Sequence, residues 1–401
     1  MKYDIVIAGG GMIGTSLALA LAPLGLRVAM VEAVPRVADA QPSFDDRSTA
    51  LSRSTQRMYE AMQLWDDIAV AATPVTRIHV SDKGRFGFSH IDAEQQQVEA
   101  LGYVVINRVL GDVLHKALDK EQTLDVFCPA HIVGTRLGHE SAIVTIEHAG
   151  GDTEELSSRL LVAADGAKSS VREMAGIAAK HIVYGQRAIV GNLLPEKSLA
   201  NCAYERFTEH GPLALLPIND GRAGFVWTVP DSDADRILAL DDSTFLGELQ
   251  EAFGYRLGTF AQVGTRAAYP LALSKAMRLT ATRTVLVGNA AHGLHPVAAQ
   301  GFNLGLRDVA ALCDCIAEID LDDPELLVRY AAWRKSDQSK LLGFTDGLVR
   351  LFGYSSRPVR VLRDIGMLSF DLVPGVRSLF AKHAMGLAGR LPKLSRGVPL
   401  S

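Results

Sequence analysis

The first 32 residues constrain the fold of this chain more than any other segment. Tyr3–Ala8 is predicted to be a buried parallel strand, and Gly9, Gly11 and Gly14 follow it directly. A long apolar helix is expected after the glycines, and a second strand over Arg27–Val31. A strand, a glycine-rich turn, a helix and a second strand form a βαβ unit. The chain is therefore predicted to be an α/β protein with a parallel sheet.

Each glycine of the turn has a separate task in a dinucleotide site. Gly9 permits a tight turn, Gly11 lets a pyrophosphate approach the helix N-terminus, and Gly14 allows close packing of helix on strand. Met12 and Ile13 lie between the last two glycines, in the first turn of the helix, and belong to the same predicted site.

An acidic residue stands where such a site needs one. Glu32 ends the second strand and lies 21 residues after Gly11, so its side chain can hydrogen-bond the hydroxyl groups of an adenosine ribose. A carboxylate there would repel a 2′-phosphate, which argues against NADP. The segment predicts FAD or NAD and does not choose between them.

Two later segments repeat the change from strand to helix. An apolar strand ends in Asp165-Gly166, before a helix capped by serine. A second apolar strand ends at Gly288-Asn289, and a glycine-rich turn with His292, His295 and Pro296 leads into a helix over 302–316. Such a turn brings backbone N–H groups close to an electron-rich ligand. Either segment alone is also compatible with an ordinary connection.

In this order, the three segments resemble the single-component flavoprotein aromatic hydroxylases, which are similar in architecture to p-hydroxybenzoate hydroxylase. Further segments resemble the ubiquinone-biosynthesis branch, and within it the hydroxylases of 2-octaprenyl-6-methoxyphenol: 44–52, 205–217, 268–273 and 285–291. The resemblance runs from Lys2 to about Leu391. The FAD motifs are specific to the superfamily, whereas the choice among sister hydroxylases depends chiefly on 205–217.

The resemblance implies a Rossmann-like FAD domain interleaved with a β-sheet substrate domain, followed by a helical C-terminal region. Strand–helix alternation assigns residues 1–75, 101–178 and 280–335 to the FAD domain. Residues 76–100 and 179–279 form the predicted substrate domain, and 336–401 the C-terminal region. The strands expected in the substrate domain are His181–Leu194, Ala203–Phe207, Leu213–Pro217, Ala223–Val229 and Gln262–Tyr269.

The resemblance also assigns cofactor contacts, with FAD and not NAD at the N-terminal glycines. It places backbone groups of Gly301, Phe302 and Asn303 at the pyrimidine edge of the flavin and Pro296 against the ring near the reacting carbon. Asp165, Gly288 and Asn289 complete the set, with Asn289, usually Asp in the wider family, against the ribityl chain and pyrophosphate. Arg47 and Arg108 match positions near the phosphates and adenosine, and the Val133 backbone a position near adenine.

The implied activity is that of an FAD-dependent monooxygenase. It would use O2 and NAD(P)H, without a separate nicotinamide domain, and act through a flavin C4a-hydroperoxide. The implied reaction converts the prenylated phenol 2-polyprenyl-6-methoxyphenol to 2-polyprenyl-6-methoxy-1,4-benzoquinol. His295 is a candidate proton carrier because histidine titrates near neutrality, and the alternative is that the His-Pro turn only shapes the site. Phe207, Leu215, Pro217 and Trp227 are candidates for an apolar ring pocket, with an ordinary core role as the alternative.

Charge is unevenly distributed along the chain. The chain totals −4, yet residues 340–401 hold ten Lys/Arg against three Asp/Glu, which makes +7 there and −11 elsewhere. A basic region with an apolar face can rest on an anionic membrane surface. The alternatives are a helical cap on the FAD domain and a contact in a homo-oligomer. No recognition motif accompanies the charge, so nucleic acid is not an expected partner.

The four cysteines, Cys128, Cys202, Cys313 and Cys315, show no CxxC or metal-ligand spacing, so no metal site is predicted. Free thiols, and a first strand at Tyr3 that leaves no room for a targeting peptide, lead us to expect a cytoplasmic protein, with peripheral contact at the inner face of the membrane left open. Other functions also stay open: a sister hydroxylase acting at another ring carbon, a flavin-dependent reductase of prenyl chains, or a non-catalytic flavin-bearing scaffold for other ubiquinone-synthesis proteins.

Overall fold

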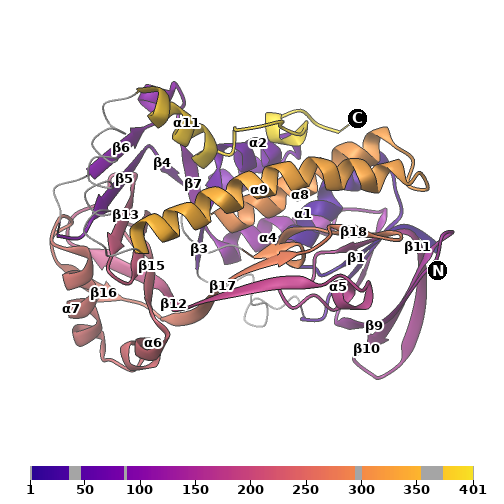
Figure 1. Cartoon of the computed structure of the whole chain (residues 1–401), viewed down its shortest axis with the longest axis horizontal. Helices are drawn as coiled ribbons and strands as arrows, with labels where there is room; N and C mark the ends of the chain where they lie inside the picture. Colours follow the sequence, from indigo (N-terminus) through magenta and orange to yellow (C-terminus); the bar gives the residue numbers. More distant parts are fainter. Residues whose placement is uncertain (1, 36–46, 85–87, 294–299, 354–373, 401) are drawn as a thin grey trace.

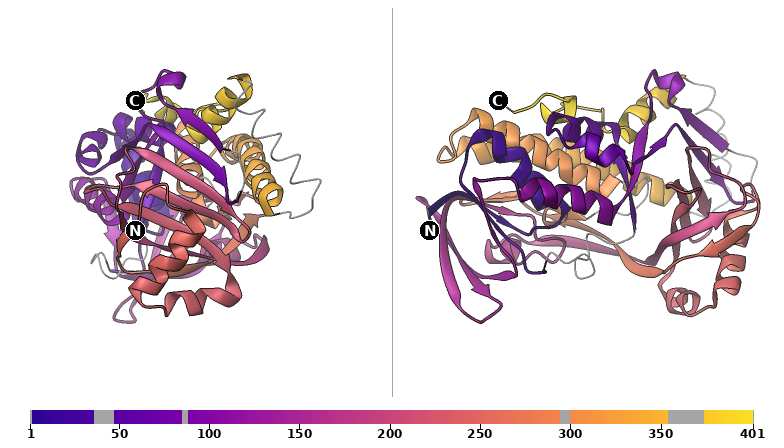
Figure 2. Two further views of the ribbon diagram at one scale, coloured as in Figure 1. Left: turned by 90° about the vertical axis from the view of Figure 1, so that its left-hand side faces the viewer. Right: turned by 180° about the vertical axis from the view of Figure 1, so that it is seen from behind.

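The computed structural model describes residues 2–35, 47–84, 88–293, 300–353 and 374–400. Within these residues the chain forms three sheets, with the two large ones at opposite ends of the molecule and the strands β12 and β17 running between them (Figure 1). The long helices α8 (Gln300–Glu318) and α9 (Glu325–Gly353) lie side by side along the molecule in both views (Figure 2).

The first sheet is parallel at its centre, in the order β18-β19-β11-β1-β2-β8, with β10 and β9 added beside β11. Ile5 and Ile7 are completely buried, and strands covered on both faces are expected to be apolar throughout. The core beneath α1, α4 and α8 lies on one face, and residues of β9 and β10 pack on the other. The elements are β1 (Lys2–Ala8), α1 (Met12–Leu21), β2 (Val28–Val31), α4 (Asn107–Leu118), β8 (Leu124–Phe127), β9 (Ala130–Leu137), β10 (Ala142–His148), β11 (Thr153–Ala163), α5 (Ser170–Met174), β18 (Thr280–Ala281) and β19 (Thr284–Leu286).

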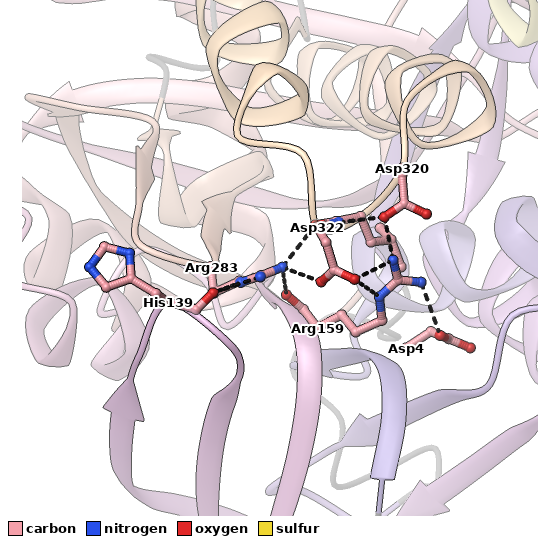
Figure 3. Close-up of polar contacts among 7 residues, drawn as sticks. Asp4, His139, Arg159, Arg283, Asp320 and Asp322 are labelled. Atoms are coloured by element: carbon pink, nitrogen blue, oxygen red, sulfur yellow. Dashed lines mark hydrogen bonds and ion pairs between the residues drawn. The ribbon is translucent and has the colours of Figure 1, made fainter.

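A group of ion pairs holds the end of this sheet where β1 and β19 begin (Figure 3). Arg159 on β11 contacts the carboxylates of Asp4, Asp320 and Asp322. Arg283 donates to Asp322 at 2.7 Å and to a carbonyl oxygen of the β9–β10 turn. These carboxylates are partly exposed, so each pair stabilises the fold by at most about 1 kcal/mol. The glycine turns lie at the other end of the strands.

The second sheet has the order β20-β17-β12-β15-β14-β13-β5-β6, with β16 paired to β12. Its longest strand, β12, pairs with β15 over Gln186–Leu193 and with β17 over Ala179–Val190, with a register shift between Val183 and Arg187. The elements are β5 (Arg77–Asp82), β6 (Phe88–Asp92), β12 (Ala179–Pro195), β13 (Cys202–Thr208), β14 (Gly211–Pro217), β15 (Ala223–Pro230), α6 (Asp231–Leu238), α7 (Asp242–Phe253), β16 (Phe260–Val263), β17 (Ala267–Ala276) and β20 (His292–Gly293).

The two faces of the second sheet have different neighbours. On one face, which we call the helix-covered face, the Trp227 ring lies edge-on to Phe245 of α7. On the other face, which we call the inner face, a side chain added at Gly224 would lie 2.3 Å from the hydroxyl of Ser48 on β3. Ala203 of the inner face packs against strands of the third sheet. The inner face is therefore directed toward the third sheet.

The third sheet is small and has the order β3-β7-β4. Its elements and the remaining helices are β3 (Ser48–Ser52), α2 (Arg53–Ala61), α3 (Trp65–Ala69), β4 (Thr73–Val75), β7 (Gly102–Ile106), α11 (Pro374–Ala384) and the short 3-10 turns Ala22–Leu24, Glu94–Gln96, Gly288–Ala290 and Leu394–Arg396. Across the described ranges, none of the helices combines the length and the apolar character needed to cross a membrane.

The observed elements correct the predicted strands and helices in two places. The strand expected over Gln262–Tyr269 is two strands, β16 and β17, because the chain leaves the sheet at residues 264–266. Two helices, α6 and α7, lie in the segment that was expected to be sheet and turns. Helix α9 continues across residue 336, where the C-terminal region was predicted to begin. The predicted domain boundaries stay a prediction.

Candidate active site

The three predicted turns meet at the carboxyl end of the first sheet. A side chain added at Gly9 would lie 2.6 Å from the carbonyl oxygen of Ala164, at the end of β11. One added at Gly288 would lie 3.2 Å from the Ile13 side chain at the start of α1. Segments far apart in sequence therefore form one site, at the edge where parallel sheets bind ligands.

The N-terminus of α1 is open toward this edge. Gly11 caps the helix without a side-chain hydrogen bond, and Gly9 has φ +100°, a conformation that residues with side chains rarely adopt. A side chain at Gly14 would lie 1.9 Å from the Gly9 carbonyl oxygen, so helix and turn are in direct backbone contact. Free backbone N–H groups at a helix N-terminus are suited to bind a phosphate.

Glu32 lies beside the same turn and is 8% exposed. One of its carboxylate oxygens accepts the Gly10 N–H at 2.5 Å, and the other accepts the Val34 N–H at 2.7 Å. Each oxygen of a carboxylate can accept more than one hydrogen bond, so Glu32 keeps acceptor capacity for ribose hydroxyls. Its role in FAD binding stays a prediction.

The turn after β19 is held by buried charge. The Asp308 carboxylate on α8 accepts the Gly288 N–H at 3.0 Å, lies 2.6 Å from His292 Nε2 and accepts Nε of Arg334 at 2.7 Å. Burial alone would raise the pKa of Asp308, but His292 and Arg334 outweigh burial and hold it at about 2. His292 therefore has a structural partner, and the turn is fixed by α8 and α9.

The first turn of α8 is tied to β3. The Asn303 side chain accepts the Ser52 N–H at 2.8 Å and the Thr55 hydroxyl at 2.7 Å, and donates to the Ala50 carbonyl oxygen at 2.9 Å. These bonds engage the side-chain amide and leave the predicted flavin contacts of Asn303 to its peptide group. Among residues 2–35, 47–84, 88–293, 300–353 and 374–400, no atom would lie within 4 Å of a side chain added at Gly301.

Comparison with known proteins identifies the family. The FAD binding domain family model matches residues 2–345. The chain is 37% identical to the ubiquinone hydroxylase UbiL of Rhodospirillum rubrum over 99% of this chain and 93% of that protein. It is 31% identical to the 3-demethoxyubiquinol 3-hydroxylase of Escherichia coli over 96% and 98% of the two chains. The chain belongs to the ubiquinone-biosynthesis flavoprotein monooxygenases.

A solved structure agrees with this assignment at the level of the fold. The p-nitrophenol 4-monooxygenase of Pseudomonas putida superposes on this monooxygenase with a TM-score of 0.81 at 18% identity, covering 97% of this chain and 100% of that one. The predicted fold is thereby confirmed, and the family model with its relatives confirms the FAD-dependent monooxygenase class and the FAD cofactor.

The residues of this monooxygenase fit FAD. Oδ2 of Asp165 accepts the N–H of Val171 at 3.1 Å, whereas Oδ1 is buried and has no hydrogen-bond partner in the part of the chain that the structure describes. Buried carboxylate oxygens are nearly always paired, so a ligand hydroxyl is the expected partner here. The described residues likewise leave space around a side chain added at Gly301.

The other predicted cofactor residues differ in exposure and in their place in the fold. Asn289 is exposed, Arg108 is exposed at the start of α4, and Val133 is 48% exposed on β9. The Arg47 guanidinium stacks 4.4 Å from the centre of the Tyr269 ring, on the second sheet. His295 and Pro296 lie outside the described residues. None of these contacts with FAD is tested, and they stay predictions.

The four predicted substrate residues do not lie together. Phe207 is buried on the inner face, because it lies four residues after Ala203 on β13 and its side chain therefore points to the same side. Leu215 and Trp227 belong to the core beneath α6 and α7. Pro217 lies two residues after Leu215 on β14, so it points to the same face. Their packing against the helices leaves Phe207 as the one of the four that we keep in the proposal below.

Sequence reasoning missed the neighbours of these residues, which lie on the inner face. Ala214, Leu216 and Val226 are partly exposed there, and so is Glu205 on β13. Successive side chains of a strand point to opposite faces, so residues one position away from Leu215 or Trp227 could have been identified as lying on the other face. The sequence prediction chose Leu215 and Trp227 because an amino-acid sequence shows the size of a side chain directly but not the face of the sheet to which it points.

Proposed function

We propose that this monooxygenase hydroxylates the aromatic ring of a prenylated phenol in ubiquinone biosynthesis, converting 2-polyprenyl-6-methoxyphenol to 2-polyprenyl-6-methoxy-1,4-benzoquinol. The observation that carries the proposal is the inner face, where the apolar side chains of Ala214, Leu216 and Val226 stay partly exposed in the middle of a sheet. The alternate residues of the same strands are buried. A neutral methoxyphenol with an isoprenoid chain needs such a surface for binding.

The inner face and the FAD edge share one strand. Gly224 of the inner face contacts Ser48 on β3, and Ser52 at the other end of β3 is bonded to Asn303 on α8. A ring held against the inner face would therefore be positioned by the same strand that fixes the predicted flavin contacts of α8. Holding the reactants in one orientation is a major contribution of a protein to such a reaction.

The chain's residues have distinct tasks in this proposal. The open N-terminus of α1 would hold the pyrophosphate, Glu32 the adenosine ribose, and the N-terminus of α8 the pyrimidine edge of the flavin. Bound FAD, reduced by NAD(P)H, supplies the activation of O2. The apolar inner face would keep water from the ring during oxygen transfer.

A second candidate is hydroxylation at another ring carbon. It is favoured by the name of the Escherichia coli relative, a 3-demethoxyubiquinol 3-hydroxylase that is 31% identical. Both candidates use the same apolar surface and the same cofactor, and they differ in the substrate that accumulates when the enzyme is missing.

Deletion of the gene in its host, followed by identification of the accumulated prenylated phenol, tests the proposal. We expect loss of ubiquinone and accumulation of 2-polyprenyl-6-methoxyphenol. Accumulation of a later, methylated quinol would favour the second candidate, and an unchanged ubiquinone content would contradict both. With purified protein, substrate-stimulated NAD(P)H oxidation coupled to hydroxylated product excludes a scaffold without activity.

Membrane contact through the basic segment 340–401 stays a proposal beside this one. An enzyme acting on a polyprenylated phenol must meet its substrate at or near a lipid surface, and the segment's charge of +7 suits an anionic surface. Sedimentation with vesicles of phosphatidylglycerol and phosphatidylcholine, compared with phosphatidylcholine alone, measures it. Equal sedimentation with both would contradict the proposal.

A further inference from the structure

Glu205 is an ionisable residue in the middle of the apolar inner face. Along β13, Glu205 lies two residues from both Ala203 and Phe207, so the three side chains share the inner face. Ala203 packs against Val75 and Val104 of the third sheet. Its neighbours on the adjacent strands are Val80 of β5 and Ala214 of β14. A carboxyl group therefore stands among small apolar side chains, on the face that we propose receives the substrate.

The carboxyl group has no partner of its own in the part of the chain that the structure describes. Burial raises the pKa of Glu205 to about 7, and no charge or hydrogen bond contributes to the shift. Two titratable groups lie toward this side of the sheet: Asp82, which is the register partner of Phe207, and Arg47, whose guanidinium lies against Tyr269. Glu205 is partly exposed while its neighbours are apolar, so its carboxyl group is poorly solvated and yet open to a ligand on the inner face.

We propose that Glu205 is a catalytic residue that accepts the phenolic proton of the substrate during oxygen transfer. This inference rests on the proposed function, because a phenol must lie on the inner face. The apolar neighbours Ala214 and Val226 would carry the ring, and the carboxylate would face its hydroxyl group. No residue of the sequence prediction had this role, since His295 was the candidate proton carrier.

The proton and electron balance is as follows. As an electron pair of the ring forms the new C–O bond, the O–O bond of the activated oxygen breaks and its electron pair goes to the departing oxygen. The phenolic O–H bond electrons form the C=O bond of a dienone, and the proton moves to the Glu205 carboxylate. The proton at the hydroxylated carbon moves to the departing oxygen, and the electrons of that C–H bond restore the aromatic ring. The C=O electrons return to the dienone oxygen, which takes its proton back from Glu205. Glu205 ends the cycle unchanged.

Glu205→Gln tests the assignment, because glutamine keeps the size and can still hydrogen-bond a phenol but cannot accept its proton. Glu209→Gln is the matched control, since Glu209 lies four residues further on and its side chain is 79% exposed. We expect Glu205→Gln to lower kcat by about 100-fold or more while KM and FAD content stay close to wild type. The wild-type rate should rise with pH through about 7, and the variant should lose that dependence.

A second measurement does not depend on turnover. In FAD-loaded protein labelled with 13C at the glutamate side-chain carboxyls, one carboxyl signal should titrate near pH 7 and be missing in Glu205→Gln. Glu205→Asp should recover part of the lost rate, because it restores a carboxylate one carbon further back. This titration and the Asp variant decide the question if Glu205→Gln loses its fold or its FAD.

The possible outcomes separate the two proposals. If wild-type protein hydroxylates a prenylated phenol and Glu205→Gln keeps its rate and pH profile, the catalytic assignment is wrong and the proposed function survives. A Glu205 carboxyl that titrates near 4 would also overturn the assignment. If wild-type protein oxidises NAD(P)H without hydroxylating any prenylated phenol, the proposed function fails and the assignment falls with it.

Discussion

Nε2 of His292 lies 2.6 Å from Oδ2 of Asp308, and both side chains are completely buried. The same carboxylate accepts the N–H of Gly288 and the guanidinium of Arg334. Arg334 in turn pairs with Asp337, which also binds Arg307. The turn that carries the predicted flavin contacts is thus fixed by a charge network reaching from α8 to α9. His292 serves the position of the backbone in this network.

Asp308→Asn is predicted to destabilise the fold by about 3–5 kcal/mol, because it leaves the buried charge of Arg334 without its main partner. Asp320→Asn is the control, since Asp320 is 67% exposed in the cluster of Figure 3 and should change stability by about 1 kcal/mol or less. Urea unfolding at pH 7 measures both. Equal effects of the two substitutions would contradict the importance of the buried network.

The pH dependence of the unfolding free energy, measured for wild type and Asp308→Asn, provides a second check. The pKa of Asp308 is about 2 in the folded protein and 3.8 in its ordinary state, so its stabilising contribution is complete above about pH 4. The contribution is lost as the pH falls through that range toward 2. Asp308→Asn should lack this part of the acid sensitivity, and a parallel pH profile for wild type and variant would contradict the assignment.

Gly14→Ala is predicted to displace α1 from the glycine turn, because the added carbon would lie 1.9 Å from the Gly9 carbonyl oxygen. We expect a loss of about 3 kcal/mol in unfolding free energy and a fall in bound FAD. Gly247→Ala is the control, since Gly247 is exposed in the middle of α7 with open space around it. That substitution should stabilise the protein by about 1 kcal/mol and leave the FAD content unchanged.

Much of the FAD half could be predicted because each element has a local cause. The strand β1 is apolar and buried over its last four residues, Gly9 needs a positive φ, and Glu32 follows the glycines at the distance that a ribose requires. The charged residues that hold the Gly288 turn in place could not be predicted in the same way. Asp308, Arg334 and Asp337 come together only because α8 and α9 pack side by side, which no local pattern expresses.

The substrate half shows a different limit. The strands β13, β14 and β15 were predicted closely, yet the face of each side chain was not. Leu215 and Leu216 are equally apolar in sequence, but only Leu215 lies under α7, because α6 and α7 cover one face of the sheet. These two helices were themselves missed, since the segment after β15 begins with polar turn residues. Without the covering helices, the inner face could not be distinguished.

Gly301→Val is predicted to abolish FAD binding or flavin reduction without unfolding the protein. A side chain at Gly301 meets no atom of the described residues within 4 Å, so we expect the protein alone to accept valine. With FAD the added branches would occupy the approach of the ring, and we expect the FAD dissociation constant to rise at least about 100-fold, or about 3 kcal/mol. Flavin absorbance and urea unfolding of the FAD-free protein measure both effects. A yellow, fully active variant would refute this placement of the ring.

Leu215→Ala and Leu216→Ala are predicted to have opposite signatures, although the two residues are adjacent. Leu215 is completely buried beneath the helices, so its truncation should reduce the unfolding free energy by about 2–5 kcal/mol and leave KM for the prenylated phenol nearly unchanged. Leu216 is partly exposed on the inner face, so its truncation should raise KM about 10-fold with a smaller loss of stability. Unfolding curves and steady-state kinetics on both variants separate the two roles. If Leu215→Ala raises KM and Leu216→Ala does not, the substrate lies on the helix-covered side, and the inner face must be abandoned as its binding surface.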